Sequence, residues 1–313
     1  MSKKRKQSAK PANLTKMNIL LSTDSNYIPI VKALLNSLFD NNRDCAISIH
    51  LLHSKLDEDE LSDINNTIQL YNGKFYSYKL DISSYGDTIC KPTRLPMETY
   101  YRLFCLDYLP RSVKKVLYLD CDIIINGSIK ELYNVDISRL MFAAADDFHE
   151  VLNYPPDYWV CQIVDGYLPK THKYVNAGVL LMNIDRLRQV MTTKEIISMI
   201  EELGDIIVFH DQDFINYLFY KHIYHVDYKL YNYFPVYGDW EELEYMQPAI
   251  IHFAGFFKPW KDDYYEKCES FIMKHQGRTR QFVTQAKELF DKYAAMAENS
   301  NIEKMNSEKS SEE

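Results

Sequence analysis

The sequence predicts an α/β fold in which a mainly parallel sheet is flanked by helices. Apolar, strand-like runs alternate with helical segments through residues 17–125, which is the rhythm of βαβ units with right-handed crossovers. Acidic residues stand where two of these runs meet polar sequence, Asp24 after the first and the pair Asp120 and Asp122 in the fourth. Because ligands bind at the carboxyl ends of strands in open sheets of this kind, the acids mark the expected binding edge.

A polar, basic segment precedes the first strand. Residues 1–16 have a positive start but no apolar stretch behind it, so we expect a disordered leader and no secretory signal. The first strand is the apolar run Met17–Leu21, which ends at the polar residues 22–24. Residues 28–42 then carry apolar side chains at helical spacing and end at two asparagines, which predicts a helix.

The alternation continues to the fourth strand. Residues 46–53 predict a second strand, and residues 56–73 predict a helix with carboxylates near its positive N-terminal end. Residues 74–82 alternate as a third strand. Residues 97–109 predict a helix that stops before a proline, and residues 114–125, KKVLYLDCDIII, predict the fourth strand.

The second half of the chain is less regular. Further strands are expected at residues 140–148, 173–184 and 248–260, the last of them broken by a turn. Further helices are expected at residues 192–203 and 211–221, with Asp211 at or near the N-cap of the second. No linker is long enough to separate two domains, so we expect one domain over residues 17–297 and a disordered polar tail over residues 298–313.

The last helical segment, residues 278–297, is amphipathic. Its apolar side chains gather on one side, at Phe282, Ala286, Leu289, Phe290 and Tyr293. Packing on the domain is the expected role, and peripheral contact with a membrane surface is the alternative. Because no window reaches the ~18 apolar residues of a membrane span, we expect a cytoplasmic protein that is either free or peripheral on the inner face of the membrane.

Charge and composition argue against some partners and sites. The formal net charge of −8 makes a nucleic acid an unexpected partner, since there is no excess of basic residues to bind it. Glycine is scarce, at 9 residues, and neither G-x-G-x-x-G nor G-x-x-x-x-G-K occurs, so phosphate loops of these two kinds are not expected. The 6 cysteines have no C-x-x-C spacing and are expected to be reduced thiols.

Asp120 and Asp122 are the first candidates for chemistry. Residues i and i+2 of a strand project to the same face, so both carboxylates could face one cation. Hard oxygen ligands of this kind suit Mg²⁺ or Mn²⁺. A polar strand end that caps the next turn is the alternative interpretation of the pair.

The segment IIHFAGFFKPW adds three residue types that suit the same site. His252 directly follows an apolar strand, where a neutral, core-packed histidine is the alternative, and an imidazole ligand would favour Mn²⁺. Gly255 permits close approach of the backbone to a ligand. Lys258 offers a point charge suited to a phosphate. Together with the two aspartates, these residues describe a site for a metal-bound diphosphate.

Several separated motifs stand in an order that resembles a known family. They are STDSNYI, TYYRL, LYLDCDIII, AAADDF, VNAGVLLMN, HDQDFIN and HFAGFFKPW, between Met17 and Trp260. In these motifs the chain resembles the family 8 glycosyltransferases, which are retaining enzymes of GT-A fold, and most of all the bacterial lipopolysaccharide-type galactosyl- and glucosyltransferases. The resemblance implies a Rossmann-like, mixed and mainly parallel sheet.

The resemblance also implies roles for individual residues. Around the nucleotide of a UDP-sugar it places Ser22, Thr23, Asp24, Asn26 and Tyr27, with Asp24 and Asn26 on the uracil and Tyr27 packed on the base. As ligands of Mn²⁺, with Mg²⁺ as the alternative ion, it places Asp120, Asp122 and His252, and on the diphosphate Gly255 and Lys258. Around the transferred sugar it places Arg102, Asp146, Asn176, Ala177, Gly178, Asp211 and Gln212.

Retention of configuration normally suggests two inversions through a carboxylate nucleophile. The residue that this family places on the far face of the sugar is a glutamine, here Gln212, which is a poor nucleophile. The hypothesis is therefore front-face transfer, in which the leaving phosphate oxygen accepts the acceptor's proton. Asp211 is the alternative nucleophile.

The predicted activity is transfer of glucose or galactose from a UDP-sugar to the hydroxyl of a saccharide or a lipid-linked saccharide, and the choice between the two hexoses stays open. Residues 149–173 diverge from the family and are where acceptor contacts are expected. Two alternatives are a glycogenin-like primer protein that glucosylates its own tyrosine and a non-catalytic nucleotide-sugar binder. The intact motif residues around the sugar disfavour the second.

Overall fold

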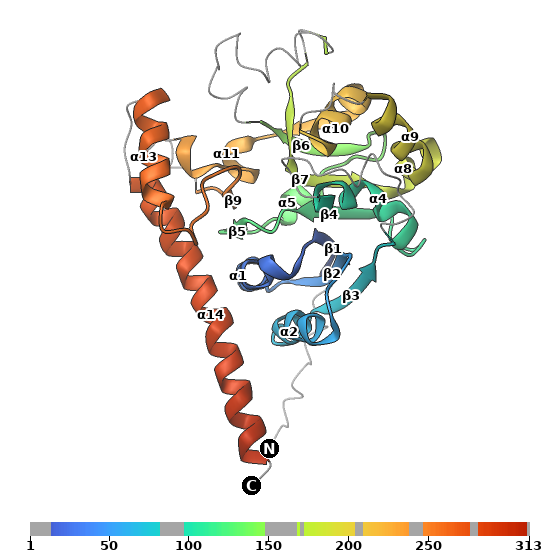
Figure 1. Ribbon diagram of the computed structural model, residues 1–313. Helices are drawn as coiled ribbons and strands as arrows, with labels where there is room; N and C mark the ends of the chain where they lie inside the picture. Colours follow the sequence, from blue (N-terminus) through green and yellow to red (C-terminus); the bar gives the residue numbers. More distant parts are fainter. Residues whose placement is uncertain are drawn as a thin grey trace, which may run out of the picture.

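A mixed, mainly parallel sheet forms the centre of the computed structural model (Figure 1). The structure describes residues 14–81, 97–147, 168–169, 172–203, 209–237, 247–275 and 281–311. The strand order is β3-β2-β1-β4-β7-β6-β8. The strands are β1 (Thr15–Ser22), β2 (Cys45–His53), β3 (Lys74–Lys79), β4 (Lys115–Leu119), β6 (Phe142–Asp146), β7 (Val175–Asn183) and β8 (Ile223–Val226).

The pairing confirms the predicted fold class. Strand β1 pairs in parallel with both β2 and β4, and β3 continues this parallel half at one edge. Strand β7 runs antiparallel to its neighbours β4 and β6, and β8 pairs in parallel with β6. Among the described strands of this sheet, β7 alone therefore opposes the common direction, and the carboxyl ends of the others share one edge.

The predicted leader and first strand meet two residues earlier than expected. Thr15 and Lys16 were assigned to the leader, but they pair with Cys45 and Ala46 of β2 and so belong to β1. Hydrogen bonding of the backbone extends the strand beyond its apolar part, because ladder bonds need no apolar side chain. The rest of the predicted leader, residues 1–13, lies outside the described residues.

The predicted fourth strand is two strands. Strand β4 ends at Leu119, the chain turns through residues 120–122, and β5 (Ile123–Ile125) pairs antiparallel with β9 (Ile250–His252) in a separate small sheet. The expectation that Asp120 and Asp122 occupy one continuous strand is therefore wrong. The two carboxylates lie in the turn, where they face the pocket instead of the packed interior in which an unpaired charge is costly.

Helices cover both faces of the large sheet. On one face lie α1 (Ile28–Asp40) and α2 (Glu58–Gln69), whose apolar side chains join those of alternate strand residues. On the other lie α4 (Tyr101–Tyr108), α8 (Ile184–Val190), α9 (Thr193–Leu203) and α10 (Asp211–Phe219). The short elements are η1 (Ser25–Tyr27), η3 (Met97–Tyr100), α5 (Lys130–Tyr133), η5 (Tyr220–His222), α11 (Tyr228–Tyr231) and η6 (Pro235–Tyr237). The prediction that helices flank the sheet is confirmed, because side chains that alternate along the strands give both faces of the sheet an apolar surface for helices to cover.

Helix α14 (Gln281–Ser311) closes the chain and follows α13 (Tyr264–His275) (Figure 1). Its residues Phe282, Ala286, Phe290 and Tyr293 are buried in a third core cluster, with Leu289 partly buried beside them. The Nδ2 of Asn36 on α1 donates to the carbonyl of Tyr293 at 3.3 Å. The expected packing on the domain is confirmed, so this apolar side is not available for the alternative contact with a membrane.

The helix also continues past the predicted boundary at residue 298, through most of the segment expected to be a disordered tail. The sequence of α14 contains neither glycine nor proline, so no residue in it ends the helix. No helix among the described residues has both the length and the apolar character needed to cross a membrane.

Candidate active site

A cavity of about 400 Å³ opens at the carboxyl ends of β1 and β4. Most of the sequence-predicted site residues line it, namely Ser22, Thr23, Asp24, Tyr27, Arg102, Asp120, Asp122, Asn176, Ala177, Gly178, Asp211, Gln212, His252, Gly255 and Lys258. They come from segments far apart in the chain, and the sheet topology brings them together. Asn26 and Asp146 do not line the cavity.

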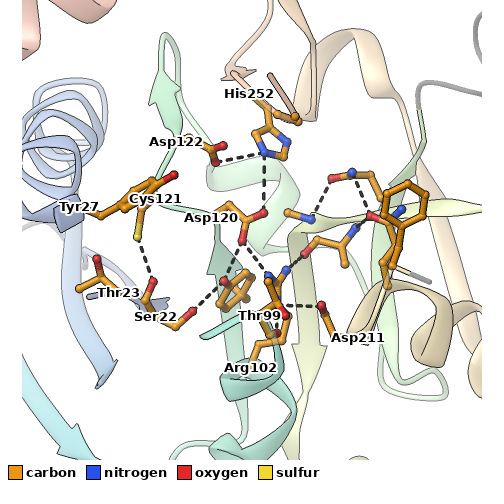
Figure 2. A pocket seen from close by; sticks show the side chains of 18 of the residues that line it. Ser22, Thr23, Tyr27, Thr99, Arg102, Asp120, Cys121, Asp122, Asp211 and His252 are labelled. Atoms are coloured by element: carbon orange, nitrogen blue, oxygen red, sulfur yellow. Dashed lines mark hydrogen bonds and ion pairs between the residues drawn. The ribbon is translucent and has the colours of Figure 1, made fainter. Parts of the chain in front are cut away.

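Asp120, Asp122 and His252 face one another (Figure 2). One ligand atom of each lies within 4.8 Å of the others. The Nε2 of His252 is 3.3 Å from Asp122 Oδ1 and 3.8 Å from Asp120 Oδ2. The register of β5 and β9 causes this approach, since it places His252 opposite Ile123, the residue after the turn. Two carboxylates and one imidazole are a donor set that fits a divalent cation such as Mn²⁺ or Mg²⁺.

Lys258 contacts the carboxylate oxygen of Asp122 that does not face His252. Its Nζ donates to Asp122 Oδ2 and, at 2.8 Å, to the carbonyl of Phe253. Burial by itself would raise the pKa of Asp122, but the charge of Lys258 prevails and lowers it. Burial would likewise lower the pKa of Lys258, yet the Asp122 charge keeps it raised. The site therefore holds an ionised carboxylate beside a charged ammonium group.

Arg102, on the buried side of α4, connects two acids (Figure 2). It donates from Nη2 to Asp120 Oδ1 at 2.9 Å, and its Nε lies 2.9 Å from Asp211 Oδ2. It also donates to the carbonyls of Thr99 and Ala177, and its guanidinium lies 4.1 Å from the ring centre of Tyr118. Much of its donor capacity is thus used within the protein, and this orients Asp120.

Asp211 is the first residue of α10, as the expected position near the N-cap requires. Burial raises its pKa to about 7; the Arg102 charge opposes this rise and the Asp120 charge adds to it. Asp211 Oδ2 lies at ion-pair distance from Arg102, but no donor among the described residues reaches it with hydrogen-bond geometry. Its preceding residue, His210, has φ 49°, a conformation that is uncommon for a residue with a Cβ.

Gln212 is held by a set of amide contacts. Its Oε1 accepts from Asn176 Nδ2 at 3.1 Å and from the Ala177 N–H at 3.0 Å, and its Nε2 donates to Asp147 Oδ2 at 3.2 Å. Asn176 Nδ2 donates to the same Asp147 oxygen at 2.9 Å. At this end of the cavity, neutral amides surround the carboxylate of Asp147. Donors and acceptors of this kind suit the binding of hydroxyl groups.

Asp147, not Asp146, is the acid of this pair that lines the cavity. Asp146 Oδ1 accepts from His225 Nδ1 at 2.7 Å, and its Oδ2 accepts from Lys173 Nζ at 3.1 Å. Adjacent residues at a strand end point to different sides, so only one of two consecutive acids can reach the cavity. The expectation that Asp146 lies in the sugar-binding part of the cavity is therefore not met, since Asp147 occupies that position. The motif AAADDF does not distinguish between two adjacent aspartates.

At the other end of the cavity, Asp24 caps η1. Its Oδ1 accepts from the Asn26 backbone N–H at 2.8 Å, and its Oδ2 accepts from Asn26 Nδ2 at 3.5 Å, so the side chain of Asn26 is directed toward Asp24. The ring of Tyr27 packs edge-on against Trp260, with centroids 5.9 Å apart. Gly255 has φ 65°, which favours glycine, and apart from its chain neighbours no atom of the described residues lies within 4 Å of where its Cβ would be.

Sequence reasoning missed several residues of the cavity wall and one behind it. The lining residues not foreseen include Thr99, Tyr118, Cys121, Asp147, Phe209, Phe234 and Ala254. Behind the wall, Asn232 is fully buried and hydrogen-bonded to His252. A buried asparagine has no periodic signal in a sequence, so only the contact reveals it. The predicted acceptor segment, residues 149–173, lies almost entirely outside the described residues.

Solved structures agree with this fold. A structure of the galactosyltransferase LgtC in complex with donor and acceptor sugar analogues superposes with a TM-score of 0.67 at 22% identity, over 87% of this chain and 100% of that one. This identity is low enough that the likeness concerns the fold, which is the GT-A fold.

Relatives in bacteria match at the level of sequence. A Haemophilus influenzae protein is 28% identical over 64% of this chain, and the match covers 58% of that protein's length. A lipopolysaccharide 1,2-glucosyltransferase of Escherichia coli is 24% identical over 78% of this chain and 73% of its own. The general stress protein A of Bacillus subtilis is 24% identical over 79% of this chain and 88% of its own.

A family model assigns the chain directly. The model of glycosyl transferase family 8 matches residues 18–264, which include every element of the site described above. The match covers most of the chain, and it agrees with the motifs, the sheet topology and the cavity. The chain belongs to glycosyl transferase family 8.

Proposed function

We propose that this glycosyltransferase is a retaining, Mn²⁺-dependent hexosyltransferase that uses UDP-glucose or UDP-galactose as donor. The observation that carries the proposal is the convergence of Asp120, Asp122 and His252 beside the cavity. The hydroxyl acceptor is a saccharide or a lipid-linked saccharide. The Escherichia coli relative named above is a glucosyltransferase and the LgtC structure is a galactosyltransferase, which supports a choice between these two sugars.

Asp120, Asp122 and His252 are the residues that would hold the cation. When bound there, the ion supplies Lewis-acid stabilisation of the charge that develops on the leaving diphosphate. Lys258 stands at the same end of the cavity, where its ammonium can add a second positive charge for that diphosphate. Tyr27 offers a flat surface for the base at the outer part of this end.

The transferred sugar would lie at the amide end of the cavity. There Asn176, Gln212 and Asp147 present both donors and acceptors, which can bind sugar hydroxyls. The ring of contacts keeps Gln212 oriented with its amide oxygen between two donors. Arg102 supports the position of Asp120 from behind.

The same arrangement favours front-face transfer. Gln212 is a neutral amide, and Asp211 is a buried acid with a raised pKa that faces Arg102, so neither is an effective nucleophile. In this scheme the bond between the sugar and the phosphate oxygen breaks as the acceptor oxygen bonds to the same face of the anomeric carbon. The acceptor's proton passes to the leaving phosphate oxygen, and Gln212 supports the developing positive charge.

A donor panel tests the proposal. With Mn²⁺, UDP release should be fast with UDP-glucose or UDP-galactose, slow with other nucleotide sugars, and abolished by EDTA. Asp122→Asn should reduce the rate at least ~100-fold, because the cation loses a charged ligand. Asp44→Asn is the matched control, since Asp44 is an exposed partner of Lys130, and it should keep the wild-type rate. Release that persists in EDTA would refute the assignment.

The stereochemical part has its own test. Mass spectrometry of the enzyme quenched during turnover should find no sugar attached to Asp211 or Gln212. A covalent sugar trapped on either residue would overturn front-face transfer. Sugar accumulating on a tyrosine after incubation with UDP-glucose would instead support the self-glucosylating alternative.

A further inference from the structure

Asn232 is a buried polar residue that touches the cation ligands from behind. It follows α11, its side chain is fully buried, and its backbone N–H donates to the Tyr228 carbonyl at 3.1 Å. The next residue, Tyr233, bridges to Ile251 of β9. The backbone of Asn232 is therefore held directly beside the strand that carries His252.

The orientation of its side-chain amide follows from its neighbours. The Gly178 backbone N–H can only donate, and it donates to Asn176 Oδ1 at 2.9 Å, so the oxygen of that amide must face it. Asn232 approaches the same oxygen at 3.0 Å and must present its Nδ2 there. Its Oδ1 then faces His252 Nδ1 at 2.8 Å.

This orientation determines the tautomer of His252. An amide oxygen only accepts, so the neutral imidazole must carry its proton on Nδ1 and leave the lone pair on Nε2. That lone pair lies on the side of Asp122 and Asp120, at 3.3 and 3.8 Å. In the opposite tautomer an Nε2–H would donate to the acids, and the imidazole could not serve as a ligand there.

Asn232 also connects the cation ligands with the sugar end of the cavity. Its Nδ2 donates to Asn176, whose own Nδ2 donates to Gln212 and Asp147. A single chain of amides therefore runs from the imidazole to the glutamine. In each of these amides the oxygen faces the imidazole end of the chain, and the NH₂ group donates to the next member or, in Gln212, to Asp147.

We infer that Asn232 is a positioning residue with two separable tasks. Its oxygen holds His252 in the tautomer that can bind a divalent cation, and its NH₂ group orients Asn176 and Gln212 around the sugar. The inference rests on the proposed function, because it assigns a task within the cation site. Partners of this kind behind a ligating histidine typically change metal affinity 10–100-fold when they are removed.

Two variants separate the tasks. Asn232→Leu keeps the branching and the number of side-chain heavy atoms and removes both hydrogen bonds, so Mn²⁺ affinity should fall ~10–100-fold. Asn232→Asp keeps an acceptor for His252 and loses the donor to Asn176. It should bind Mn²⁺ within a few-fold of wild type, but its kcat at saturating Mn²⁺ should fall more than ~10-fold, because the amides around the sugar lose their order.

Asn36→Leu is the matched control. Asn36 is also buried, and its hydrogen bonds join it to Tyr293 of α14 and to Tyr71, neither of which is a cation ligand. This variant should lose stability to urea and keep the wild-type affinity for Mn²⁺, measured by electron paramagnetic resonance of the free ion. A loss of affinity in Asn36→Leu equal to that in Asn232→Leu would reduce the effect to general destabilisation and overturn the inference.

The tautomer is measured without metal. In the wild-type protein at about pH 8.5, where an unperturbed imidazole is neutral, ¹⁵N-histidine spectra should show the His252 proton on Nδ1, with His252→Gln used for assignment. The same signal should persist in Asn232→Asp and be lost in Asn232→Leu. A proton on Nε2 in the wild type refutes the inference, even if Asn232→Leu does not fold. Wild-type protein with the proton on Nδ1 but no affinity for Mn²⁺ would refute the proposed function while leaving the tautomer assignment standing.

Discussion

Arg102 shows how single residues set the charge balance of the site. One guanidinium lies between Asp120 and Asp211; Arg102 and Asp211 are buried, and Asp120 is partly exposed. A buried carboxylate without a partner costs several kcal/mol. The single positive charge of Arg102 cannot neutralise both acids, so the pair lacks one positive charge. The shortfall of positive charge falls on Asp211, whose burial raises its pKa to about 7.

Asp211→Asn should change how stability depends on pH. Because the folded pKa of about 7 exceeds the ordinary 3.8, the folded state keeps this proton after the unfolded chain has lost it. The stabilising contribution of Asp211 is thus complete below pH ~4 and is lost as the pH rises through ~7. The free energy of unfolding of Asp211→Asn relative to wild type should therefore increase across this window, by a few kcal/mol at ~1.4 kcal/mol per pKa unit.

Urea unfolding of both proteins between about pH 4 and 8 measures this difference. Asp44→Asn is the control, since the Lys130 hydrogen bond lowers the pKa of Asp44 and its effect should be confined to acid pH. A difference between Asp211→Asn and wild type that stays constant from pH 4 to 8 would contradict the raised pKa.

At the scale of elements, the site forms because the ends of several strands lie next to one another. The turn after β4 presents two acids, β9 brings His252 across from β5, and β7 passes close behind them. The close passage depends on Gly178, whose N–H and carbonyl bond to Asn176 Oδ1 and to the Asp120 N–H. A side chain at this position would occupy the space of the ligands themselves.

Gly178→Ala should separate the ligands without unfolding the sheet. A Cβ there would lie 2.2 Å from His252 Cε1 and 2.8 Å from Asp120 Oδ2, so both side chains must move. We expect Mn²⁺ affinity to fall at least ~10-fold, as measured by paramagnetic resonance. Gly127→Ala is the matched control, because its Cβ would meet nothing closer than 3.4 Å. Equal Mn²⁺ affinity in the two variants would show that the predicted crowding is absent.

At the scale of the whole molecule, three core clusters hold the fold together. Two of them lie on the two faces of the large sheet. The third joins α14 to α1 and to the residues that flank His252. Phe290 of α14 is central to it, since its ring lies 6.0 Å from that of Phe253 and 5.5 Å from that of Trp260. The end of the chain thus supports the small sheet that carries one of the candidate ligands.

Phe290→Ala should destabilise the protein by roughly 3–5 kcal/mol, the usual loss when a buried phenylalanine leaves a cavity. Chemical denaturation monitored by circular dichroism measures the loss. Gln285→Ala, on the exposed side of the same helix, should stay within about 0.5 kcal/mol of wild type. If Phe290→Ala lost less than ~1 kcal/mol, α14 would not be an integral part of the core.

The sequence by itself determined the fold class, most of the elements and the family, because these depend on local periodicity and on motifs that stand whole in the chain. It also placed Asp120, Asp122 and His252 in one group, because their side chains are all suitable ligands for a divalent cation although they stand far apart in the sequence. Only the tertiary structure decided that the fourth strand divides at Asp120, that Asp147 rather than Asp146 reaches the cavity, and that Asn232 lies behind His252. These outcomes depend on contacts between distant segments, which no local pattern of residues encodes.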